Sequence, residues 1–226
     1  MTTHDQFLAA VKAGDTAAME RLLAGNPTLA DARDDHGISA LLLAAYHGQP
    51  ATRDLLAGRK TSLDVFEAAA LGDCGRLTAL IGADPIAAHA ISPDGFPVVA
   101  LAAFFGQVEA LGLLLAAGAD PTVGATNELR VTALHAAVAQ RDPVVSFALV
   151  RLLLTHGARV NVAQRGGWMP LHATAAHGPA EQVRLLLAHG ADANATNDDG
   201  KTALDLAEAA GRVENAAILR AAGCAG

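Results

Sequence analysis

The sequence predicts an all-α solenoid of about seven helix–turn–helix units repeated along the chain. An apolar residue recurs after 34, 24, 34, 35, 37 and 33 residues, at Phe7, Leu41, Val65, Val99, Leu134, Leu171 and Leu204. A glycine stands seven residues after each of these positions except Leu134, where Arg141 takes its place. Hydrophobic residues make up 52% of the chain but aromatic residues only 4%, which favours thin helices packed closely. Because one such unit cannot bury its own apolar face, its recurrence is what makes the fold stable.

The clearest unit runs from Trp168 to Asn194. Pro170 suits the first turn of a helix, where its missing N–H would be unpaired in any case. Gly178 has no Cβ and is expected to end this helix in the left-handed conformation. A second helix follows, and its apolar stripe stops at Gly190. The unit is therefore predicted to be a helix, a tight turn, a second helix and a polar loop.

This unit resembles an ankyrin repeat, whose signature Thr-Pro-Leu-His-x-Ala recurs with a period near 33. Pro170, Leu171 and His172 match the signature, and Met169 stands in the place of the threonine. The stretch 132–135 restores the threonine in the preceding unit. The resemblance covers essentially the whole chain. It implies short β-hairpin-like fingers along one edge, a concave groove beside the inner helices, and a role in binding other proteins.

We expect residues 1–226 to form a single array. The expected repeats lie at about 4–33, 34–62, 63–91, 92–121, 122–161, 162–194 and 195–226. Only 24 residues separate Leu41 from Val65, which is about ten too few for a hairpin finger, so the third repeat is predicted to lack one. This gap is either a neutral deletion or a notch where a partner reaches the helix wall. The finger at 122–131 is two residues longer than standard and lacks the turn glycine.

Charge and composition exclude several functional classes. A net charge of -7 without basic clusters argues against nucleic acid, which rewards a cationic surface. The apolar stretch 96–119 carries Glu109 near its middle and glycines where the repeat needs them, so we expect no membrane span. The N-terminus lacks a basic region ahead of an apolar run, which predicts a cytoplasmic protein. Cys74 and Cys224 are expected to be a buried thiol and a tail thiol without a disulfide.

No pattern in the sequence supplies a catalytic apparatus. HExxH, paired CxxC, GxSxG and phosphate-loop motifs are all missing, so we expect no enzyme activity, no cofactor and no metal. His135 and His172 occupy the same place in adjacent repeats, and the resemblance implies that they bridge backbone groups of neighbouring fingers. The alternative function is a small-molecule or metal-dependent enzyme that uses the finger surface.

The aromatic residues point to a binding surface. The resemblance places the variable groove positions before the stop glycines and beside the finger glycines. Five of the eight aromatic residues fall there, and the predicted partner-binding set is Tyr46, His47, Leu71, Phe96, Phe104, Phe105, Arg165, Trp168 and His177. The alternative is that some of these rings tuck between repeats, while Phe7, Phe66 and Phe147 are assigned to the core.

The predicted function is a non-enzymatic scaffold that binds another protein through its concave groove and fingers. A regulator or inhibitor of one specific enzyme is a narrower form of this hypothesis. Self-association, in which the partner is a second copy of the chain, stays open at this point.

Overall fold

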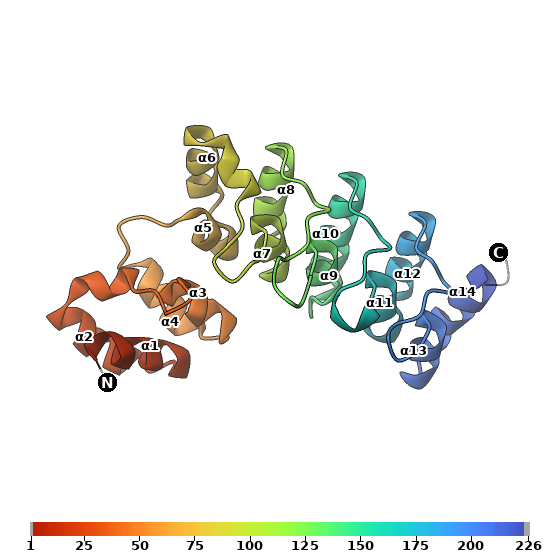
Figure 1. The fold of residues 1–226 in the computed structure, drawn as a ribbon, viewed down its shortest axis with the longest axis horizontal. Helices are drawn as coiled ribbons and strands as arrows, with labels where there is room; N and C mark the ends of the chain where they lie inside the picture. The colour runs from red at the N-terminus through yellow and green to blue at the C-terminus, as the bar shows by residue number, and fades with distance from the viewer. Residues whose placement is uncertain (1, 224–226) are drawn as a thin grey trace.

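The chain folds into a row of helix pairs (Figure 1). The computed structural model describes residues 2–223. These residues contain fourteen α-helices and three short 3-10 helices, and extended pairing within them is limited to isolated bridges. The predicted all-α class is therefore confirmed. Among the described helices, none is both long enough and apolar enough to cross a bilayer.

Each pair consists of an inner helix, which faces the concave side, followed by an outer helix. The inner helices are α1 (Thr3–Ala13), α3 (Ala40–Tyr46), α5 (Val65–Leu71), α7 (Val98–Phe104), α9 (Ala133–Val138), α11 (Pro170–His177) and α13 (Ala203–Ala209). The outer helices are α2 (Thr16–Gly25), α4 (Pro50–Ala57), α6 (Cys74–Ala83), α8 (Val108–Ala116), α10 (Pro143–Thr155), α12 (Ala180–Ala188) and α14 (Val213–Gly223). The 3-10 helices are η1 (Pro27–Asp31), η2 (Pro85–His89) and η3 (Arg165–Gly167).

Short fingers precede most of the inner helices. Four fingers close with a single antiparallel bridge, at Arg33–Ser39, Ile91–Pro97, Gly124–Thr132 and Thr196–Thr202. Backbone hydrogen bonds then join successive fingers, with N–O distances of 2.9, 2.9 and 3.0 Å for Thr126–Gly95, Arg165–Leu129 and Asp198–Gly166. These bonds hold the fingers from 92 onward as one connected edge.

Glycines end the inner helices largely as predicted. Five of the stop glycines have left-handed backbones with φ between 64° and 75°. The prediction is wrong for Gly178, whose φ of −81° and ψ of 169° are extended. The next residue is Pro179, and a proline disfavours the helical region for the residue before it. Gly178 is required for another reason, because a Cβ there would lie 2.7 Å from Thr174 Cγ2.

The hydrophobic core divides at the junction between the second and third pairs. One cluster of buried side chains extends from Phe7 to Leu56, and a second extends from Ala68 to Leu219. Leu63 packs against both clusters. Figure 1 shows the four N-terminal helices grouped at one end of the row, with a long loop leading from α4 to α5. No bridge closes a finger in this loop, as the short spacing in the sequence predicts.

Side chains located at or near the starts of the outer helices connect most neighbouring pairs. Gln107 and Gln140 donate to the inner-helix carbonyls of Ala70 and Ala103 in the preceding pair, at 3.0 and 2.7 Å. Asp73 stands at the equivalent place in the third pair, where it accepts from a backbone N–H of its own helix instead. The junction before α5 therefore lacks both the finger pairing and this side-chain tie.

Ion pairs replace these missing ties. Lys60 Nζ lies 2.5 Å from Asp31 Oδ1 and 3.2 Å from Glu67 Oε1, and Arg33 pairs with Asp64 at 2.8 Å. The side chains of Lys60 and Glu67 are only 4% and 1% exposed. These groups line a hollow of about 460 Å³ at the junction, which is the place of the predicted notch. Because the pairs made by Arg33 and Lys60 span the junction, they tie the N-terminal helices to the rest of the array.

Candidate functional site

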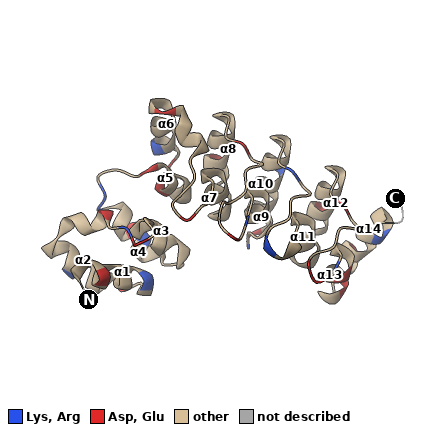
Figure 2. Ribbon diagram, viewed as in Figure 1, with Lys and Arg blue, Asp and Glu red and all other residues tan. Residues whose placement is uncertain are grey.

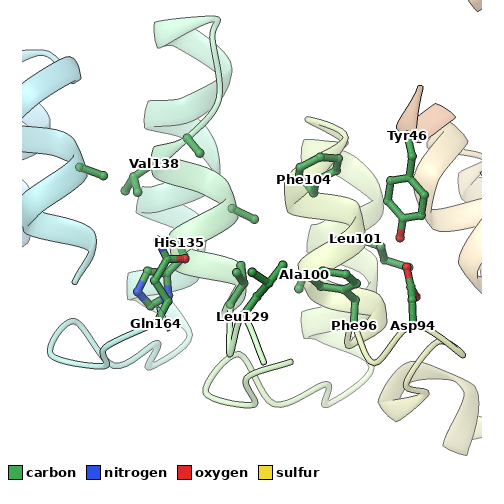
Figure 3. A pocket seen from close by; sticks show the side chains of 14 residues that line it. Tyr46, Asp94, Phe96, Ala100, Leu101, Phe104, Leu129, His135, Val138 and Gln164 are labelled. Atoms are coloured by element: carbon green, nitrogen blue, oxygen red, sulfur yellow. The ribbon is translucent and has the colours of Figure 1, made fainter. Parts of the chain in front are cut away.

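The concave side contains an apolar groove of about 440 Å³ (Figure 3). Residues from the end of α3, from α7, α9 and α11, and from three fingers form its wall. The lining residues are Tyr46, Asp94, Phe96, Ala100, Leu101, Phe104, Leu129, Val131, His135, Ala136, Val138, Ala139, Gln164 and Ala173.

Three rings meet at one end of this groove, and we call Tyr46, Phe104 and Phe105 the aromatic cluster. The Tyr46 ring centroid lies 6.1 Å from that of Phe104 and 5.5 Å from that of Phe105. The two phenylalanine rings meet edge to face at 5.0 Å. Phe104 remains 52% exposed, whereas Tyr46 and Phe105 are half-buried. A large apolar ring is thus displayed on a supported base.

The missing finger explains how this cluster forms. Tyr46 is the last residue of α3 in the second pair, and Phe104 is the last residue of α7 in the fourth pair. Their contact therefore skips the third pair, to which α5 belongs. With no finger ahead of α5, the finger at 34–38 faces the one at 92–96. A Cβ built on Gly37 would lie 3.4 Å from Pro93 Cβ, which is ordinary contact. The short junction therefore brings two non-consecutive units together at the groove.

Polar groups stand beside the rings at the same end of the groove. The Tyr46 hydroxyl is buried beside Asp94. Figure 3 shows it pointing toward Asp94, with Phe96 nearby. Burial, the charge of Asp94 and a hydrogen bond to its carboxylate together raise the pKa of Tyr46 well above its ordinary value. The Asp94 carboxylate accepts from the Ser92 hydroxyl, and the Asp94 backbone oxygen accepts from Asn127 Nδ2 at 2.7 Å.

His135 in the groove wall is a structural group. Its Nδ1 accepts the Thr132 N–H at 3.2 Å, and its Nε2 donates to the Trp168 carbonyl at 3.1 Å. Burial lowers the pKa of His135, so the imidazole is held neutral. His172 repeats the arrangement, with Nδ1 accepting from Met169 at 3.0 Å and Nε2 on the Ala195 carbonyl at 3.0 Å. The predicted bridging of neighbouring fingers by these histidines is confirmed.

The structure brings together only part of the predicted binding set. Tyr46, Phe96 and Phe104 line the groove, and Phe105 supports them. The half-buried Trp168 ring instead packs against His172, with centroids 6.1 Å apart.

The other predicted residues lie away from the groove wall. Leu71 packs against the N-terminal core cluster. His47, Arg165 and His177 are exposed at helix ends or on a finger.

Sequence reasoning missed the contribution of the long finger. Leu129 and Val131 line the groove, and Leu129 is 43% exposed. Arg130 between them has a φ of 52°, the only positive value of a non-glycine residue in the described chain. The sequence contains a signal for this contribution, because the finger at 122–131 is longer than its neighbours and carries Leu129, an apolar residue in a polar loop. Gln164, on the next finger, also lines the groove.

The three phenylalanines that the sequence assigned to the core are buried to different degrees. Phe7 is fully buried, and Phe66 is half-buried against the core. Phe147 was expected in the core but is half-buried on the outer surface beside Val144. The reason is its place on α10, because the buried positions of that helix form a stripe through Ser146, Leu149 and Val150 that passes to one side of it.

The described residues contain one cysteine. Cys74 is half-buried and free, and burial raises the pKa of its thiol. Cys224, the expected tail thiol, lies outside the described residues. Between residues 2 and 223, no three His, Cys, Asp or Glu side chains gather as metal ligands would.

Stacked helix pairs with connected fingers define the class of helical-repeat solenoids. Over residues 145–225, the chain matches the family model described as ankyrin repeats (3 copies). Residues 145–225 are therefore ankyrin repeats, and the helical fold of the residues before 145 is consistent with that family. No curated protein matches the sequence. Ankyrin repeats are a protein–protein interaction module, and the family is typically non-enzymatic.

Proposed function

We propose that this protein is a non-enzymatic scaffold that binds a partner protein through its concave groove and fingers. The observation that carries the proposal is the aromatic cluster, which presents the half-exposed Phe104 ring at the mouth of an apolar groove. Contiguous apolar surface on a protein usually marks an interaction site. We also propose that residues 1–226 form one array of seven repeats, so that the groove belongs to a single continuous surface.

The groove is suited to binding because it is already formed. Phe105 and Tyr46 hold the Phe104 ring from two sides, so few side-chain rotations remain to be lost on association. Immobilising a free side chain at an interface costs about 0.5–1.5 kcal/mol, and a supported ring avoids much of that cost. Residues that dominate binding energy are commonly rings packed on a rigid base.

The predicted binding residues then divide into two groups. Tyr46, Phe96, Phe104 and Phe105 form the anchor at the groove. The remaining members lie around it and are proposed to make peripheral contacts: His47, Leu71, Arg165, Trp168 and His177. Contacts at a rim contribute less to affinity than those at a desolvated centre.

A narrower form of the proposal is that the bound partner is an enzyme, which this protein regulates or inhibits by occupying its surface. A nucleic acid partner is disfavoured by the net charge of -7. Self-association through the same groove would make the partner a second copy of this chain, and sedimentation of the wild type separates the two cases.

The proposal is tested by capturing partners from native lysate with three proteins: the wild type, Phe104→Ala and Ile86→Ala. Ile86 is the matched control, because it is a 73% exposed apolar residue that does not line the groove. A partner retained by the wild type and Ile86→Ala should bind Phe104→Ala about 30-fold more weakly, which corresponds to about 2 kcal/mol. Equal affinity of all three proteins would remove the groove from the binding surface.

A further inference from the structure

The groove is almost free of charge. Its helical wall is built by α7, α9 and α11, none of which contains Asp, Glu, Lys or Arg (Figure 2). Asp94 is the one Asp, Glu, Lys or Arg residue among the lining residues. Within the part of the chain that the structure describes, no lysine or arginine forms an ion pair with it. A single carboxylate without a cationic partner therefore lies at the edge of an apolar surface.

A second polar group lies beside this carboxylate. The Tyr46 hydroxyl is buried and directed at Asp94, and its ring is fixed by Phe104 and Phe105. Because a tyrosine hydroxyl is neutral, it can orient the carboxylate but leaves the negative charge of Asp94 uncompensated. Figure 3 places this hydroxyl, the Asp94 carboxylate and the rings of Phe96 and Phe104 around one end of the groove.

From this arrangement we propose that the groove binds a lysine or arginine side chain of the partner, flanked in the partner by apolar residues. The proposal deepens, and rests on, the proposed role of the groove in protein binding. The cationic head lies between Asp94 and the faces of the surrounding rings, where it is attracted both by the carboxylate and by the negative ring faces. Its N–H groups donate to Asp94, and its apolar neighbours lie along Leu129 and Val138.

Other occupants fit these groups less well. An acidic segment would face Asp94 at close range and a chain that already carries a net charge of -7. A wholly apolar segment would remove water from the Asp94 carboxylate without supplying a cation in its place. A basic residue within an apolar segment neutralises the carboxylate and covers the rings.

The first test uses small probes that differ only in the charged head. n-Pentylammonium and the neutral 1-pentanol are titrated separately into the full chain, and binding is followed by NMR at Phe104. We expect the wild type to bind pentylammonium at least about 5-fold more tightly than pentanol, as one charge pair and the ring contacts imply. The preference should disappear in Asp94→Asn, which keeps an oxygen to accept from Ser92. Equal binding of both probes to the wild type would overturn the proposal.

The matched control is Asp199→Asn. Asp199 precedes the finger glycine Gly200, just as Asp94 precedes Gly95, but it is exposed and lies outside the groove lining. The control removes the same charge from the protein, so it should keep the preference for pentylammonium. If Asp199→Asn loses the preference as Asp94→Asn does, net charge alone is responsible and the site is refuted.

A second test separates this inference from the proposed function. Phage-displayed random 12-residue peptides are selected on the wild type, Asp94→Asn and Asp199→Asn. We expect the wild type and Asp199→Asn to enrich Lys or Arg between apolar residues, and Asp94→Asn to enrich apolar residues alone. Peptides that need Phe104 but show no basic preference on the wild type would refute the cationic site and leave the groove as a binding surface. Partner binding that is insensitive to Phe104→Ala would refute both.

Discussion

Loss of the Lys60 charge should uncouple the N-terminal helices from the rest of the array. Lys60 Nζ lies 3.2 Å from Glu67 Oε1, and both side chains are almost fully buried. The variant Lys60→Met keeps the apolar stem but leaves the Glu67 carboxylate without its cation. Breaking one side of a buried ion pair costs about 3–5 kcal/mol, because the remaining charge stays desolvated. The stability is lost at the junction between the two core clusters. This junction lacks both the finger pairing and the glutamine hydrogen bonds that connect other neighbouring pairs.

The double variant Lys60→Met/Glu67→Gln tests whether the charge is the cause. Glu67 Oε2 also accepts the Asp64 backbone N–H at 3.0 Å, and a glutamine oxygen can accept the same bond. The double variant should therefore recover most of the stability lost by Lys60→Met. Because the two residues are in contact, their effects should be strongly non-additive.

Hydrogen–deuterium exchange with urea unfolding measures where the stability is lost. In a repeat array a weak interface appears as a local boundary of cooperativity. We expect residues 2–60 to exchange faster than residues 95–190 in the wild type, and Lys60→Met to widen this difference. Uniform protection along the wild-type chain would refute the weak junction. A loss below about 1 kcal/mol in Lys60→Met would instead refute the role of the ion pair, since that is the range of exposed pairs.

Three further predictions concern the fold and the finger edge. Burial lowers the pKa of His135 below its ordinary value of 6.5, so its contribution to stability is present above about pH 6.5 and is lost as pH falls through the lowered value. Urea unfolding at high and low pH should show a smaller loss on acidification for His135→Gln than for the wild type; an equal loss would contradict this. Gly178→Ala should destabilise the protein by about 1–3 kcal/mol because its Cβ would overlap Thr174, whereas Gly82→Ala in α6, which meets nothing within 4 Å, should be neutral or stabilising. Trp168→Ala should weaken partner binding less than Phe104→Ala does, since its ring packs on His172 away from the groove; calorimetric titration that gives the reverse order would place the anchor on the fingers.

Much of the fold follows from sequence because its repeat is encoded locally. The anchor and glycine positions specify where each inner helix ends, and the short spacing before Val65 reveals the missing finger. His135 and His172 occupy equivalent places, so their shared bonding could be inferred from the family resemblance. Gly178 differs because the following proline changes its backbone, which is a local effect that the repeat pattern alone does not contain.

The site was less predictable because it depends on contacts between distant units. Tyr46 approaches Phe104 because the short junction before α5 brings the second and fourth pairs together. No local sequence pattern predicts this contact between non-consecutive pairs. Leu129 enters the groove through the conformation of a long finger, including the left-handed Arg130. Sequence position marked Trp168 as a groove residue, whereas its neighbour His172 holds the ring at the finger edge.

The most direct test of the groove as a binding surface is site-specific photocrosslinking. The photoreactive residue benzoylphenylalanine is placed at position 104 in one protein and at position 86 in another, and both are irradiated in native lysate. We expect the partner to crosslink through position 104, at a segment containing lysine or arginine among apolar residues, and position 86 to give no such product. Crosslinking of the partner through position 86 with none through position 104 would contradict it.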